Sequence, residues 1–321
     1  MTMSGPGARA LRQFRQAWWD SEFVGSTSRG PHPQCDLSPM KQLLSFALLA
    51  LATTTAAAQP APKPAPPAPP VKQAPPAAQK ASLTWFGHSA FRIETPSGKT
   101  ILVDPWLTNP SNPKGKDDAA AVKADLILVT HGHSDHVGDS VQIAKRTKAK
   151  LVATFDLGAA IVTSGFPKEQ YGMDTGGNTG GTLSLLDGEV SVTFVPAVHS
   201  STVGEGAKTM AGGSPGGFVI AIKNGPTLYH TGDTDVFADM ALVAKFSKID
   251  VMLACIGGHF TMDPVRAAEA VRLVKPKQVV PMHYGTFPPL KGTPAELGAS
   301  LKKAGAGAKL LQLEIGKPVS L

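Results

Sequence analysis

One short segment, with four metal-ligand side chains in six residues, limits what this chain can fold into. Residues 124–130 read ADLILVT, a continuous apolar run typical of a strand buried on both faces. The next residues, HGHSDH, supply His131, His133, Asp135 and His136. Residues 140–148 then have the pattern of a helix with one apolar face. A strand, a ligand-bearing loop and a helix in this order predict a functional site in an α/β domain.

The chemistry of the cluster indicates a metal centre. Neutral imidazole and carboxylate are the ligands that divalent Zn, Mn and Fe prefer, and packing four such groups together is costly without a cation. On a turn, His131 and His133 can point to one side while Asp135 and His136 point to the other. This geometry suits two metals about 3.5 to 4 Å apart. The structural alternative is a polar surface loop.

Three further side chains are predicted ligands because each follows an apolar β run and therefore stands at a strand end. They are His199, Asp233 and His283. Asp233 is suited to bridge two cations, since each of its two oxygens can bind one of them. Taken singly, a structural histidine or a capping aspartate would be the ordinary interpretation of each.

The rest of the pattern predicts mostly β structure first and strand-helix alternation later. Strands are expected at 83–94, 100–103, 150–155, 182–186, 190–196, 218–222, 227–230, 250–256, 278–282 and 309–314. Helices are expected at 157–164, 236–246, 264–274 and 294–304, and Gly-rich mobile loops at 172–181 and 204–217. Two sheets sandwiched between helices satisfy both burial patterns.

Charge and cysteine content exclude two classes of protein. The net charge is +7, but residues 1–81 hold eight basic and three acidic residues, which leaves only +2 for residues 82–321. A nucleic-acid partner is therefore not expected. Cys255 is the only thiol after residue 81, so no internal disulfide is possible there, and its apolar surroundings predict a buried side chain rather than a nucleophile.

The N-terminal part predicts export. Residues 40–58 have a positive start, a short apolar run and an Ala-Ala-Ala end, the pattern of a cleaved signal peptide. The apolar run is too short to span a bilayer, so we expect a periplasmic or secreted protein without stable membrane insertion. Residues 1–39 are interpreted as a wrongly assigned upstream extension and 59–81, with nine prolines, as a linker. Residues 82–321 are the expected metal-binding domain.

The motifs resemble those of the metallo-β-lactamase superfamily. They are WFGHS at 85–89, DPW at 104–106, THGHSDHVGD at 130–139, GHFTM at 258–262 and PMHYGTF at 281–287. Within that superfamily they look like an uncharacterised group of metal-dependent hydrolases, which is similar to L-ascorbate-6-phosphate lactonase. The resemblance covers residues 83–315 and implies a four-layer αββα sandwich, an α/β fold.

The same resemblance implies the distribution of the ligands and the chemistry. One metal would bind His131, His133 and His199, the other Asp135, His136 and His283, with Asp233 bridging. The expected activity is hydrolysis of a small ester, lactone or phosphodiester by a hydroxide bound to two divalent ions, Zn or else Mn or Fe.

Two residues are predicted to have direct catalytic roles. Asp135 would orient the attacking water, and His259 would donate a proton or contact an oxyanion. For His259 a structural role is equally open. His88 could likewise contact the metal ligands, or it could simply be hydrogen-bonded in the interior. His230 and Tyr284 are expected to be structural.

Other functions remain open from the sequence. A di-iron oxidoreductase on this fold, or a metal-binding protein without turnover, would use the same ligands. The partner is expected to be a small-molecule substrate, a β-lactam being one possibility, and a homo-oligomer is possible.

Overall fold

The structure, a computed structural model, describes residues 80–321. The predicted upstream extension and signal peptide, and the linker up to residue 79, lie outside the described residues. Within residues 80–321, no helix has the length and apolar character that crossing a membrane requires.

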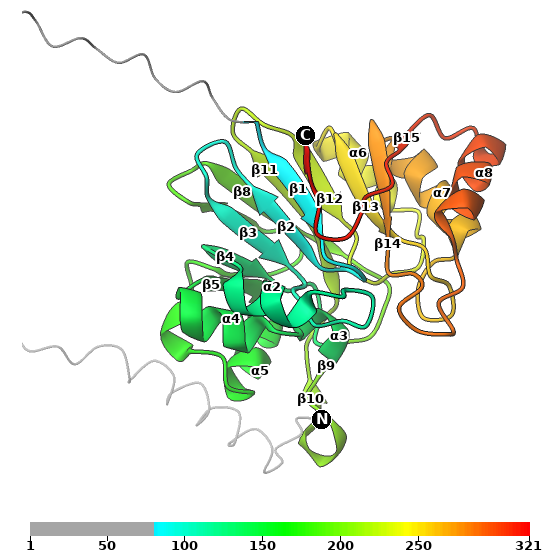
Figure 1. Cartoon of the computed structure of the whole chain (residues 1–321). Helices are drawn as coiled ribbons and strands as arrows, with labels where there is room; N and C mark the ends of the chain where they lie inside the picture. The colour runs from blue at the N-terminus through cyan, green and yellow to red at the C-terminus, as the bar shows by residue number, and fades with distance from the viewer. Residues whose placement is uncertain (1–79) are drawn as a thin grey trace, which may run out of the picture. The chain divides into compact units, whose positions relative to one another are not determined.

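The domain contains two seven-stranded sheets (Figure 1). The first has the order β16-β1-β2-β3-β4-β5-β6. Its strands are β1 (Ser82–Trp85), β2 (Phe91–Glu94), β3 (Thr100–Val103), β4 (Leu126–Leu128), β5 (Lys150–Thr154), β6 (Gly176–Gly177) and β16 (Pro318–Ser320). Strands β3 to β6 are parallel to one another, whereas β16, β1, β2 and β3 pair antiparallel.

The second sheet has the order β15-β14-β13-β12-β11-β8-β7. Its strands are β7 (Thr182–Leu185), β8 (Val190–Pro196), β11 (Gly216–Ile222), β12 (Thr227–His230), β13 (Val251–Cys255), β14 (Gln278–Met282) and β15 (Lys309–Leu310). Strands β12 to β15 are parallel, and β13 is buried along its whole length, as expected of a parallel strand covered on both faces.

Helices cover the outer face of each sheet (Figure 1). On the first sheet lie α2 (Gly115–Ala121), α4 (Ser140–Thr147) and α5 (Phe155–Thr163), and on the second α6 (Met240–Phe246), α7 (Pro264–Val274) and α8 (Pro294–Ala304). Shorter elements are α3 (Ser134–Val137), the 3-10 turns η1 (Lys168–Gln170) and η2 (Gly206–Lys208), and the two-stranded ribbon of β9 (Thr202–Val203) and β10 (Met210–Ala211). The predicted αββα sandwich is confirmed.

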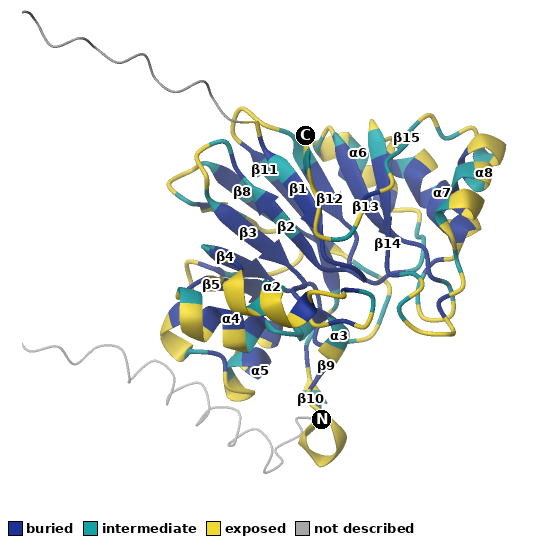
Figure 2. Ribbon diagram, viewed as in Figure 1, coloured by how far each residue is buried: buried dark blue, intermediate teal, exposed yellow. Residues whose placement is uncertain are grey.

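Side-chain alternation along the first sheet divides the core between its two faces. In β3, Ile101 and Val103 pack between the sheets, whereas Leu102 packs under the helices. In β4, Leu128 faces the other sheet and Ile127 faces the helices. Figure 2 shows the result, with buried strands and helices whose outer faces are exposed. These two buried layers hold the first sheet between the second sheet and the helices. The ends of the strands remain available for the site.

Helices α7 and α8 begin and end where the sequence predicts, whereas α6, expected at 236–246, begins only at Met240. Helix α7 has Asp263 as N-cap, accepting hydrogen bonds from the backbone N–H groups of Val265 and Arg266, and Pro264 as its first residue. Helix α8 begins with a reciprocal capping box between Thr293 and Glu296. Both boundaries agree with the prediction.

Several expectations are wrong in detail. The run 83–94 is not one strand, because residues 86–90 form a turn with His88 at φ 50°. The Gly-rich run 172–181 contains β6 at the edge of the first sheet, and the run 204–217 contains η2, β10 and the start of β11. Strand β16 and helix α2 have no clear sequence pattern and were not predicted.

Candidate metal centre

The predicted ligands follow strands of both sheets and lie in loops, except Asp135 and His136, which lie in the short helix α3. In the first sheet, β4 leads to His131. In the second sheet, β8 leads to His199, β12 to Asp233 and β14 directly to His283. Because these strand ends meet along one rim, seven residues far apart in sequence converge on one site, as the sequence predicts.

The first group of donors is His131, His133 and His199. One ligand atom from each lies within 4.8 Å of the others. His131 Nε2 is 2.9 Å from His133 Nδ1. His131 is fully buried, whereas the other two are partly exposed. This side of the site therefore opens to solvent.

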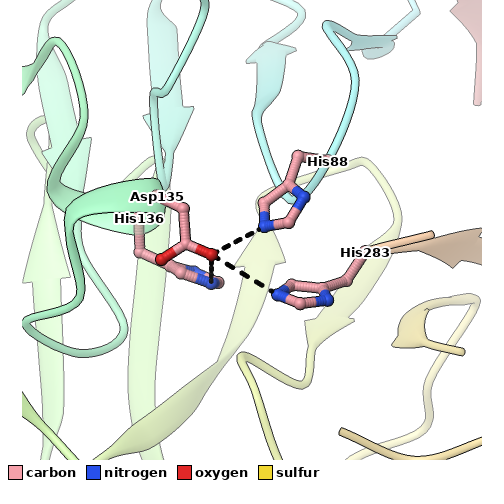
Figure 3. Close-up of side chains that lie close together, drawn as sticks. All are labelled: His88, Asp135, His136 and His283. Atoms are coloured by element: carbon pink, nitrogen blue, oxygen red, sulfur yellow. Dashed lines mark hydrogen bonds and ion pairs between the residues drawn. The ribbon is translucent and has the colours of Figure 1, made fainter. Parts of the chain in front are cut away.

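The second group is His88, Asp135, His136 and His283, whose ligand atoms likewise lie within 4.8 Å of one another. Figure 3 shows the three imidazoles around Asp135. Asp135 Oδ2 is 2.9 Å from His88 Nε2, 3.7 Å from His283 Nε2 and 4.0 Å from His136 Nε2.

Asp233 lies between the two groups. One oxygen is 3.2 Å from His136 Nε2, and the other is 2.9 Å from His283 Nε2 and 3.7 Å from His199 Nε2. Asp233 is only 2% exposed. A buried carboxylate in contact with both groups has the position that a bridging ligand requires.

Several buried polar atoms of these residues have no hydrogen-bond partner. They are His136 Nε2, Asp233 Oδ1 and both ring nitrogens of His283. His136 Nε2 lies 3.2 Å from Asp233 Oδ1 and His283 Nε2 lies 2.9 Å from Asp233 Oδ2, yet neither pair forms a hydrogen bond of acceptable geometry, and leaving such groups unpaired is costly. Lone pairs that converge in this way fit divalent cations, so this donor set suits a metal centre.

Electrostatics couples the site tightly. Burial opposes a charge on each imidazole, and it holds the pKa of His131 well below its ordinary value. For His283 burial is outweighed by Asp233 and Asp135, which raise its pKa to about 9. The pKa of Asp233 is lowered because His136 and His283 outweigh the effect of burial. Asp233 is therefore an anion among imidazoles, as a cation-binding carboxylate must be.

Asp104, the first residue of the DPW motif at 104–106, supports both groups although the sequence pattern predicts no role for it. It is fully buried, and its Oδ2 accepts hydrogen bonds from Thr130 Oγ1 and His136 Nδ1, both at 2.7 Å. Thr130 Oγ1 in turn lies 3.0 Å from His131 Nδ1. With protons on the Nδ1 atoms of His131 and His136, both Nε2 lone pairs are free for a metal. The signal that could have identified Asp104 is a carboxylate directly after an apolar strand.

Other histidines have different surroundings. His230 is fully buried between Ser89 O and the backbone N–H of Gly232, which agrees with a structural role. His259, the predicted proton donor, is exposed on a turn after β13, and its recorded ring contact is with Phe260 rather than with a ligand. The structure does not bring His259 into the donor groups, and its catalytic role stays a prediction.

An aromatic pair borders the second group. Trp106 and Phe287 stack with ring centroids 5.7 Å apart, and both meet the edge of His88. Phe287 is 37% exposed. Tyr284 stacks on Trp85 instead, which agrees with its predicted packing role.

Comparisons with known proteins show the family to which the chain belongs. The family model described as "Beta-lactamase superfamily domain" matches residues 82–283. A UPF0173 metal-dependent hydrolase of Thermodesulfovibrio yellowstonii is 54% identical over 244 residues, which cover 74% of this chain and 91% of the relative. One from Myxococcus xanthus is 47% identical over 271 residues, 83% of this chain and 93% of the relative.

Solved structures show the same fold. Igni18, a metallo hydrolase from Ignicoccus hospitalis, is 38% identical with a TM-score of 0.66, covering 76% of this chain and 99% of that one. An isothiocyanate hydrolase from Delia radicum gut bacteria shares the fold at 19% identity and a TM-score of 0.58, covering 75% and 99%. The chain, with its two groups of metal-ligand donors at one rim of an αββα sandwich, therefore belongs to the UPF0173 metal-dependent hydrolases of the β-lactamase superfamily.

Proposed function

We propose that this metal-dependent hydrolase activates water with two divalent ions, zinc in the first place, and cleaves a small ester, lactone or phosphodiester. The observation that carries the proposal is the pair of adjacent donor groups joined by the buried Asp233. Two cations bound there would lower the pKa of water from 15.7 to about 7, so no activated serine or cysteine is needed.

Each ion would have its own set of ligands. His131, His133 and His199 would hold one ion, and Asp135, His136 and His283 the other. Asp233 would hold both, because it contacts His199 of the first group and also His136 and His283 of the second. Asp135 is 23% exposed in its side chain, so it can also orient a water molecule.

Apolar surface beside the site supports a substrate with an apolar portion. Phe287 and Trp106 form a stacked pair next to His88, and Phe287 is partly exposed.

Export completes the proposal and rests on residues 40–58 alone. The protein would act on a small molecule in the periplasm or outside the cell. Fractionation of cells that express the chain tests this, with N-terminal sequencing of the exported form expected to begin after residue 58.

The activity is tested with a panel of lactones, aryl esters, phosphodiesters and β-lactams. We expect turnover that EDTA abolishes and Zn²⁺ restores, and a loss of at least about 100-fold in Asp233→Asn, since this ligand contacts both groups. Redox activity with bound iron, or two bound metals without turnover on any member of the panel, would contradict the proposal.

A further inference from the structure

His88 contacts other members of the second donor group through both its imidazole ring and its backbone. Its side chain is fully buried, with Nε2 2.9 Å from Asp135 Oδ2 and Nδ1 3.0 Å from Thr286 Oγ1 (Figure 3 shows the first contact). His88 belongs to the second donor group by distance, but it is not among the seven residues proposed to hold the ions.

The backbone of His88 reaches a second ligand. Its carbonyl oxygen accepts a hydrogen bond from the backbone N–H of His283 at 3.0 Å and another from Trp85 Nε1 at 3.0 Å. His283 itself has φ 56°, a left-handed conformation that needs such support. One residue of the β1–β2 turn thus holds Asp135 from the first half of the chain and His283 from the second.

The turn is built to present this residue. Gly87 and His88 have φ values of 95° and 50°, and a Cβ on Gly87 would lie 2.7 Å from Asn109 Oδ1. The turn is closed by hydrogen bonds from Phe86 N to Ala90 O and from Ala90 N to Gly87 O. A left-handed histidine is costly, and it persists where surrounding contacts enforce it.

The hydrogen bonds also define the tautomer. Asp135 is a carboxylate that only accepts, so His88 Nε2 carries the proton and donates to it. Nδ1 then accepts from the hydroxyl of Thr286, which leaves the imidazole neutral. The donated bond fixes the direction of the Asp135 carboxylate toward His136 and His283.

We infer that His88 is a positioning residue that sets the geometry of the second metal site by holding Asp135 through its side chain and His283 through its carbonyl oxygen. The inference rests on the proposed two-metal function. It predicts unequal effects on the two ions, because His131, His133 and His199 form a separate donor group that does not include His88.

Two substitutions at this position separate hydrogen bonding from backbone conformation. Asparagine suits the left-handed backbone but is too short for its amide to reach Asp135, whereas glutamine places an N–H donor near the position of Nε2. We expect His88→Asn to lower the affinity for the second zinc ion by about 10- to 100-fold. We expect the affinity of His88→Gln for that ion to stay within about threefold of the wild-type value. The first ion should bind as in the wild type in both.

The measurement is stepwise titration of the metal-free full chain with Zn²⁺ against a chromogenic chelator, repeated with Co²⁺ for the absorption bands of each site. Thr286→Val is a further variant that does not change the turn at residues 86–90. It should also lower the affinity for the second ion. Thermal unfolding of each metal-free variant shows whether it is folded.

The outcomes are distinguishable. If folded His88→Asn and Thr286→Val bind both ions with wild-type affinity, the inference is overturned. Equal loss of the second ion in His88→Asn and His88→Gln would overturn it as well and make His88 a ligand. If the wild type binds fewer than two ions, the proposed function fails instead.

Discussion

At the scale of single residues, Asp104 links the two halves of the metal centre through three hydrogen bonds. One carboxylate oxygen accepts from the backbone N–H of Thr130, and the other accepts from Thr130 Oγ1 and His136 Nδ1. Asp104 has φ 45°, and His88 and His283 are also left-handed. Strained residues gathered at one site are typical of functional sites, where the geometry is enforced by the surrounding fold.

Replacing Asp104 with asparagine tests this support. The amide retains one acceptor oxygen, but its NH₂ group cannot accept from Thr130 Oγ1 and His136 Nδ1. We expect metal affinity and kcat/KM to fall by about 10- to 100-fold, measured by chelator competition and steady-state hydrolysis. Asp117→Asn, at an exposed residue of α2, is the matched control and should behave as the wild type. Equal activity in the two variants would show that Asp104 does not support the metal ligands.

The sequence predicts the ligand types well and their partners poorly. The cluster His131, His133, Asp135 and His136 is local, so its spacing reveals it. The pairing of His88 with Asp135 or of Asp104 with His136 depends on how the turn after β1 and the end of β3 meet α3 in space. Such contacts follow from tertiary packing rather than local pattern, which is why His88 was expected on a strand.

At the scale of elements, the loop after β14 and the turn after β13 fix each other by close backbone packing. A Cβ on Gly257 would lie 2.1 Å from the carbonyl oxygen of His283, and one on Gly292 would lie 1.9 Å from that of Ile256. Gly292 N also donates to Gly257 O. The position of His283 therefore depends on the absence of side chains at these two glycines.

Gly257→Ala should disturb the second metal site through this contact. The backbone must shift to admit the methyl group, at a cost of roughly 1–3 kcal/mol in the free energy of unfolding. We expect a lower melting temperature together with weaker binding of the second ion. Gly307→Ala is the control, because a Cβ there meets nothing within 4 Å. Unchanged metal binding in Gly257→Ala would show that His283 does not depend on this packing.

Element prediction succeeded where hydrophobic period and capping agree. Helices α7 and α8 and strands β8, β12 and β14 have the predicted bounds, and the first two carry clear caps. Strand β16 was missed because it is three residues long and pairs only at an edge. The Gly-rich runs were misjudged because their short strands are set by neighbours in space and not by side-chain pattern.

At the scale of the whole molecule, burial of ionisable groups makes stability depend on pH. Cys255 is fully buried in β13, and burial, with a further effect of Asp233, raises the pKa of its thiol from 9.0 to about 11. Below pH 9 the thiol is protonated in both the folded and the unfolded chain. As pH rises from 9 to 11 only the unfolded chain loses the proton, so the free energy of unfolding falls.

Cys255→Ala should flatten this part of the pH dependence. The lost contribution amounts to roughly 1–3 kcal/mol, and the slope between pH 9 and 11 is the quantity to compare, because the truncation also leaves a cavity. Urea unfolding of the metal-free protein at several pH values measures it. Burial also raises the pKa of Tyr229, whose contribution remains in the variant. Identical slopes in the two proteins would contradict the assignment.

The central claim is that one chain binds two metal ions at the rim where both sheets end. Elemental analysis of the full chain, purified without chelators, tests it most directly. We expect two divalent ions per chain, and we expect Asp233→Ala to lose both, since Asp233 contacts ligands of each group. Fewer than one ion per chain in a folded protein would contradict it.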